Sequence, residues 1–229
     1  MQNIDVSTVV LAVVALFVVF KLRSVLGMRN DADRRRADAS TQPRNPTIAP
    51  APVAYSATNA AANANVPANR WAGFAEPGSP LWGGLDAIAA ADPAFAAPAF
   101  LAGARGAYEM VVTAFAAGDS AMLKTILAPD VFDNFNKAIT ARRSAGQTMS
   151  TTLIAIDAAD IVGARLAESS AQVSVRFSAK LVSVTRDAAG AVVDGSPDTV
   201  GEHLDVWTFT RDVRSRDPNW SLSATEAVH

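Results

Sequence analysis

The amino-acid sequence predicts an α+β domain in the second part of the chain, and three observations favour that class. Apolar residues recur at helical spacing between Leu81 and Ile139, and the apolar period changes to two from Ala171 onward. Turn-forming residues separate the alternating segments. Helices that precede the strands, instead of alternating with them, are typical of an antiparallel sheet covered on one face by helices.

Two helices are expected first. Residues 81–91 form a short helix that ends at Asp92, because a proline follows there. A longer helix ends at Gly118, since glycine at a helix C-terminus adopts the left-handed backbone conformation without strain. Its apolar face is made of Phe100, Leu101, Ala104, Tyr108, Val111, Val112 and Phe115.

Two more helices complete the helical part. Asp119 is placed to cap a third helix, which carries Met122, Leu123, Ile126 and Leu127. A fourth helix follows Pro129 and has its basic residues in the last turn, where they oppose the negative end of the helix dipole. Those residues are Arg142 and Arg143.

The strands follow the helices. In residues 171–181 every second side chain is apolar, which predicts a half-buried strand, and residues 200–211 resume as a strand with Trp207 and Phe209. A last strand carries Trp220, Leu222 and Ala224. Residues 187–198 are expected to form a turn, and a weaker pair of strands is expected at 148–156 and 160–166.

Composition and charge limit the function classes. The chain has no cysteine and only two histidines, so neither a disulfide framework nor a metal site is expected, and no cofactor is predicted. Residues 71–229 carry twelve Lys or Arg and eighteen Asp or Glu, a net charge of −6. This acidic part is a poor candidate for nucleic-acid binding, which needs a basic surface.

Residues 1–30 are predicted to contain a single transmembrane anchor. Residues 4–22 include an unbroken apolar run, and nineteen helical residues span roughly 28 Å, close to the thickness of the hydrocarbon core. A cleaved signal peptide fits less well, because Asp5 stands where a basic flank is required and no small-residue cleavage site follows. The anchor residues are Ile4, Val9, Leu11, Val14, Leu16, Phe17 and Phe20.

Basic residues directly after this run set its orientation, because such residues stay on the cytoplasmic side. A single-pass protein of the bacterial inner membrane is expected, with its N-terminus outside and its C-terminal domain in the cytoplasm. The bilayer is then its first partner, and the basic flank contacts anionic headgroups. The flank consists of Lys21, Arg23, Arg29, Arg34, Arg35 and Arg36.

Residues 31–78 are rich in Ala, Asn and Pro and are expected to form a disordered linker, because they cannot bury enough apolar surface to offset chain entropy. The folded domain is then 79–229. Trp71 and Phe74 are exceptions within the linker. They either dock onto the domain or form a short motif that binds a partner.

Four sequence motifs resemble the Tim forty-four-like domain family, and the resemblance covers residues 81–227. The motifs are FLAGARGAYEMVVTAFAAGD (100–119), LKTILAPDVFDNFNKAITAR (123–142), VRFSAKLVSVTRD (175–187) and DVWTFTRD with DPNW (205–220). The family includes the C-terminal domain of the mitochondrial inner-membrane import-motor tether. The short anchor, linker and single domain are most similar to its bacterial TimA adaptor type.

The resemblance implies a cone-like, cystatin-like domain in which N-terminal helices cover the concave face of a curved sheet and enclose an apolar pocket. It further implies a non-catalytic membrane-anchored adaptor for an unknown protein partner, related to protein translocation or membrane-protein assembly. The alternative is a domain that binds a lipid or acyl chain. The candidate pocket residues are Tyr108, Phe115, Phe132, Phe135, Phe177, Trp207 and Phe209, and the other interpretation is that they fill the core.

A pocket enzyme of the isomerase or hydratase type remains the third alternative. His203 and Asp205 stand two residues apart on one strand face, and a histidine oriented by a carboxylate is a reasonable acid–base pair. Two such residues near a strand end are, however, usually solvated or paired. No phosphate loop and no nucleophile motif accompanies them. The sequence therefore predicts no catalytic residue.

Overall fold

The computed structural model describes residues 70–228, and it confirms the α+β class. Four helices come first: α2 (Pro80–Ala91), α3 (Ala97–Ala117), α4 (Ser120–Ile126) and α5 (Pro129–Ser144). Five strands follow: β1 (Thr148–Ala167), β2 (Ser170–Arg186), β3 (Val192–Gly195), β4 (Gly201–Asp212) and β5 (Ser221–Ala227). The helices lie where the apolar spacing predicted them, with α3 beginning three residues before Phe100.

Two side chains and one glycine mark helix ends, and the sequence predicted two of the three, Gly118 and Asp119. Ser79 Oγ accepts a hydrogen bond from the Trp82 amide at 3.2 Å and begins α2. Gly118 ends α3 with φ at 70°, a conformation that favours glycine. Asp119 then caps α4, its Oδ1 lying 3.0 Å from the Met122 amide nitrogen.

The strands form one antiparallel sheet in the order β1-β2-β4-β5, and β3 pairs with the far end of β2. The expected pair of short strands at 148–156 and 160–166 is wrong: both belong to the single strand β1, 20 residues long. Its register against β2 shifts at Ile154, Asp157 and Val162. Each extra residue is a bulge that breaks the apolar alternation.

The turn expected at 187–198 contains a strand as well. Val192–Gly195 forms β3 and pairs with Val184, Thr185 and Arg186 at the end of β2. All of its residues are exposed, so burial left no alternating pattern from which to infer it.

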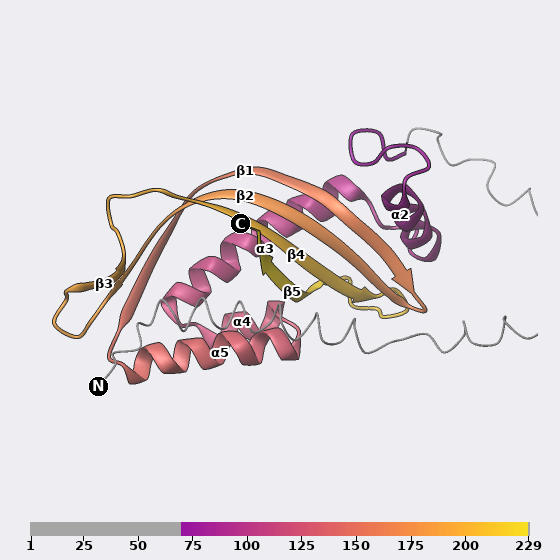
Figure 1. Ribbon diagram of the computed structural model, residues 1–229. Helices are drawn as coiled ribbons and strands as arrows, with labels where there is room; N and C mark the ends of the chain where they lie inside the picture. The colour runs from indigo at the N-terminus through magenta and orange to yellow at the C-terminus, as the bar shows by residue number, and fades with distance from the viewer. Residues whose placement is uncertain (1–69, 229) are drawn as a thin grey trace, which may run out of the picture. The chain divides into compact units, whose positions relative to one another are not determined.

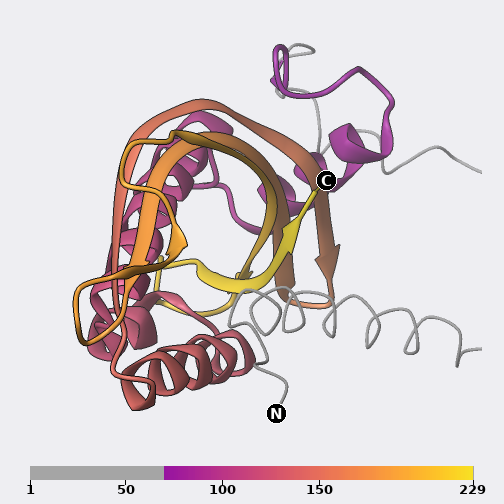
Figure 2. The same cartoon turned by 60° about the vertical axis from the view of Figure 1, so that its left-hand side comes forward.

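The sheet curves, and its concave face holds the core (Figure 1). Turned by 60°, the strands follow much of a ring around this face (Figure 2). Ala171, Val173, Val175 and Phe177 point into the concave side from β2, and all have no exposed surface. The polar residues between them lie on the convex side, where Ser174 and Thr208 share a hydrogen bond of 2.9 Å. This confirms the alternation of apolar and polar residues that the sequence predicted for residues 171–181 of β2.

The segment before α2 packs against the domain. Trp71 is 2% exposed, and its indole Nε1 donates to Asp86 Oδ1 at 2.6 Å. Its ring lies 6.1 Å from that of Phe95. Of the two alternatives for Trp71, docking onto the domain therefore describes its position, and Phe74 is half-buried beside it.

Candidate functional site

Helix α3 crosses the concave face of the sheet (Figure 1), and its aromatic residues make contacts near its start, middle and end. Near the start of the helix, Phe100 contacts Phe209 with ring centroids 5.8 Å apart. Two turns further, Tyr108 lies over β2 and β4. Near the helix end, Phe115 contacts Phe135 of α5 at 5.2 Å.

Four of the seven candidate pocket residues belong to the packed core. Tyr108, Phe177, Trp207 and Phe209 are at most 5% exposed. The Tyr108 ring centroid lies 4.8 Å from that of Phe177 and 4.6 Å from that of Trp207. Rings at these separations are in direct contact, so no ligand fits between them.

The other three residues, Phe115, Phe132 and Phe135, are half-buried. We call them the half-buried aromatic set. They lie on α3 and α5, and Phe115 and Phe135 meet edge to face at 73°. Aromatic side chains that keep solvent contact at the side of a core are suited to receive further apolar surface. The apolar pocket itself remains a prediction.

Arg142 holds this aromatic set in place by joining α5 to the end of α3. Its Nη2 donates to the Phe115 and Ala116 carbonyls at 2.6 and 3.0 Å, and its guanidinium lies 5.0 Å from the Phe115 ring centroid. Both carbonyls belong to the last turn of α3, where intrahelical donors run out, and the Phe115 carbonyl also accepts the Gly118 amide at 3.2 Å. Burial, and then the neighbouring Arg143, lower the pKa of Arg142. The sequence predicted its position in α5 but not this contact.

Tyr108 and Asp205 form a polar pair beside the packed core. The Tyr108 hydroxyl donates to Asp205 Oδ2 at 2.9 Å, across 97 positions of sequence. Burial, and then the Asp205 charge, raise the pKa of Tyr108. Burial also raises the pKa of Asp205, although the Tyr108 hydrogen bond and the nearby His203 lower it in part. Tyr108 therefore remains a hydrogen-bond donor at neutral pH.

His203 and Asp205 do lie on the same face of β4, as their spacing predicted, because they pair with Ala179 and Phe177 of β2. Their environments differ: His203 is exposed and Asp205 is half-buried. The carboxylate receives its hydrogen bond from Tyr108 and not from the imidazole. The geometry thus gives Asp205 a partner that the sequence did not indicate.

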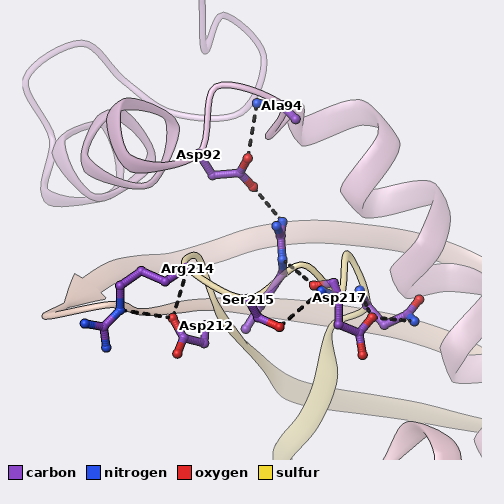
Figure 3. A network of polar contacts seen from close by, with 8 residues as sticks. Asp92, Ala94, Asp212, Arg214, Ser215 and Asp217 are labelled. Carbon is purple, nitrogen blue, oxygen red and sulfur yellow. Dashed lines mark hydrogen bonds and ion pairs between the residues drawn. The ribbon is translucent and has the colours of Figure 1, made fainter.

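A second polar network, also missed by the sequence, joins the α2–α3 connection to the end of β4 (Figure 3). Arg211 Nη1 donates to Asp92 Oδ2 at 2.6 Å, and the two side chains are only 15% and 9% exposed. The other Asp92 oxygen accepts the Ala94 amide at 3.2 Å, and Arg211 Nε lies 3.3 Å from the Asp217 carbonyl oxygen. This network fixes α2 against the sheet.

The predicted anchor and its basic flank lie outside the residues that the structure describes. Within 70–228, no helix is long and apolar enough to cross a membrane. The same part of the chain contains no group of three or more His, Cys, Asp or Glu residues placed to hold a metal ion. The residues concerned by the first prediction are Ile4, Val9, Leu11, Val14, Leu16, Phe17, Phe20, Lys21, Arg23, Arg29, Arg34, Arg35 and Arg36.

Comparison with known families places residues 81–227, the range from α2 to β5, in the Tim44-like domain. The mitochondrial import inner membrane translocase subunit TIM44 of Homo sapiens is 28% identical over 152 residues, covering 63% of this chain and 34% of the relative. Its Rattus norvegicus counterpart is 26% identical over 125 residues, covering 52% and 28%. The chain thus spans about a third of the length of these curated relatives.

Solved structures show only distant likeness. The intermembrane space region of the chloroplast protein ARC6 is 12% identical, covers 56% of this chain and 95% of its own length, and has a TM-score of 0.39. TsrD from Streptomyces laurentii is 16% identical, covers 55% and 88%, and has a TM-score of 0.26. Likenesses of this size assign neither a fold nor a function.

Proposed function

The chain belongs to the Tim44-like domain family, and from this premise we propose that it is a non-catalytic adaptor that holds a protein partner at the cytoplasmic face of the inner membrane. The observation that carries the proposal is the family match itself, which extends over all the described helices and strands from α2 to β5. The relatives are named as subunits of a mitochondrial inner-membrane translocase. We assign the adaptor a related role, in protein translocation or membrane-protein assembly.

Anchoring makes such a role possible without chemistry, because a tethered domain meets its partner at a raised effective concentration. The predicted anchor (residues 1–30) supplies the membrane attachment and residues 31–78 supply the reach. Carbonate extraction is expected to leave the full chain in the membrane pellet. A variant lacking residues 1–36 is expected to lose cellular function, and full activity of this soluble variant would contradict the tether.

The half-buried aromatic set is the contact surface that we assign to the partner. A photo-crosslinking amino acid at Phe135, in the full chain and in native membranes, is expected to yield a reproducible protein adduct. The matched control carries the same amino acid at Glu202, an exposed position whose register neighbour is Lys180 on the convex side of the sheet. Adducts of equal yield at both positions, or none at Phe135, would contradict the proposed surface.

A second candidate function is binding of a lipid or acyl chain, and the same aromatic set favours it. Phe115, Phe132 and Phe135 offer apolar surface with few polar groups, which suits a hydrocarbon chain. Native mass spectrometry of the full chain after extraction is expected to show a retained lipid if this is the function. A chain that emerges without lipid, while the crosslink at Phe135 persists, would leave the protein-binding adaptor alone.

A further inference from the structure

Asp205 is a half-buried carboxylate that makes no ion pair within residues 70–228. The ion pairs of this part of the chain join other residues, and the hydrogen bond to Asp205 comes from the neutral Tyr108 hydroxyl. Charged groups removed from water are normally paired with an opposite charge, because their desolvation is costly. Among the described residues, Asp205 therefore has no salt-bridge partner.

The second oxygen of this carboxylate is not enclosed in the core. The Tyr108 hydroxyl donates to Oδ2. In the described range, Gln147 Oε1 is the one buried side-chain atom without a hydrogen-bond partner, so Oδ1 is not such an atom. Oδ1 therefore keeps contact with solvent.

The groups around Asp205 suit a cation. The pair Phe177 and Asp205 in the β2–β4 register places the carboxylate next to the aromatic cluster, in which Tyr108 and Trp207 are in ring contact. Aromatic rings attract cations through their electron-rich faces. His203 is the titratable neighbour of Asp205 on β4. The cation of α3 nearest to Tyr108 in sequence, Arg105, donates to the Ile156 carbonyl at 3.1 Å and not to Asp205.

Resting on the proposed adaptor function, we propose that Asp205 binds a Lys or Arg side chain of the partner polypeptide while apolar residues of the same segment cover the half-buried aromatic set. The net charge of −6 in residues 71–229 favours a basic partner. Tyr108 and Phe115 are seven residues apart on α3, about 10 Å along the helix. An extended segment spans that distance with about three residues, so the cation stands three positions from the apolar residues.

Fluorescent peptides test this chemistry with the full chain in detergent micelles. Three peptides share the apolar sequence Leu-Phe-Leu, followed by Ala-Ala and then Arg, Gln or Glu. Fluorescence anisotropy is expected to show the Arg peptide binding at least about tenfold more tightly than the Gln peptide, the range of a charge-assisted hydrogen bond. Equal affinities for the Arg and Gln peptides would overturn the proposal.

Asp205→Asn separates the charge from the fold. The asparagine oxygen still accepts the Tyr108 hydroxyl, so the variant is expected to unfold no earlier than the wild-type protein while its preference for Arg over Gln disappears. Glu202→Gln on the same strand removes one exposed negative charge and is expected to retain the preference. A preference that survives Asp205→Asn would overturn the role of Asp205.

Two further outcomes separate this proposal from the adaptor function on which it rests. If the Phe135 crosslink in membranes persists at full yield in Asp205→Asn, the adaptor stands and the cation site is overturned. If the peptides show no preference but vesicles containing phosphatidylethanolamine bind in an Asp205-dependent manner, the site belongs to a lipid amine and the polypeptide partner is overturned.

Discussion

Replacing Gly84 by alanine is expected to destabilise the domain, whereas the same change at Gly83, one residue earlier in α2, is expected to stabilise it. Gly84 lies where α2 crosses β1, and an added Cβ would overlap the carbonyl oxygen of Ala164 and lie 2.6 Å from its carbon. At Gly83 no atom lies within 4 Å of the added Cβ. Neither glycine has a positive φ, so backbone strain does not separate the two positions.

The expected free energies follow from these contacts. Alanine in a helix interior is more favourable than glycine by about 1 kcal/mol, which is the whole expected effect of Gly83→Ala. Gly84→Ala gains the same amount but must displace the β1 backbone, and overpacking of this kind costs roughly 1–3 kcal/mol, here near the upper end because a carbonyl cannot rotate away. The two variants should therefore differ by about 3 kcal/mol.

Urea unfolding of the full chain, followed by tryptophan fluorescence, measures this difference. With a slope of roughly 2 kcal/mol per molar urea, 3 kcal/mol separates the two midpoints by about 1.5 M. The wild-type midpoint should lie between them, closer to that of Gly83→Ala. A Gly84→Ala protein as stable as the wild type would refute the close packing of α2 on β1.

Three further predictions concern the core and the polar pairs. Asp92→Ala and Arg211→Met should each lower the free energy of unfolding by about 3 kcal/mol, and the double variant by less than the sum, as a double-mutant cycle in urea will show. Phe177→Ala should cost about 3–5 kcal/mol but Phe132→Ala, which is half-buried, clearly less, so equal losses by calorimetry would contradict the division between the two sets. Because the pKa of Asp205 is raised in the folded protein above the ordinary value of about 3.9, wild-type stability should fall relative to Asp205→Asn as the pH rises from about 4 through that raised pKa. A difference in the free energy of unfolding between the wild type and Asp205→Asn that is constant from pH 4 to pH 8 would contradict this prediction.

The helices were predictable because their signals are local. Each helix carries its apolar residues at a spacing of three and four positions, and Ser79, Gly118 and Asp119 mark ends that depend only on adjacent backbone. Strand β1 was not, because each bulge inserts one residue and exchanges the faces to which later side chains point. Ile154 and Val162, both bulge residues, are accordingly apolar and exposed, which reads as an interruption of the strand.

The polar contacts were beyond sequence reasoning for a different reason. Tyr108 and Asp205 are 97 positions apart, and Asp92 and Arg211 are 119 apart, so no spacing rule links them. Only the direction in which α3 crosses the sheet brings Tyr108 over β4. The sequence instead paired Asp205 with His203, two residues away, because within a strand only that neighbour could be inferred to share its face.

Stability and partner binding can be separated on this domain because different turns of α3 contribute to the packed core and to the half-buried aromatic set. Phe100 near its start and Tyr108 near its middle lie in the packed core, so their replacement destabilises the fold and does not report on function alone. Phe115 lies in the last turns, where the hydrogen bonds from Arg142 go to backbone carbonyls and remain possible when the aromatic ring is replaced. A change confined to the half-buried aromatic set therefore alters the surface offered to a partner while the fold remains, and loss of a partner in such a variant reports on binding alone.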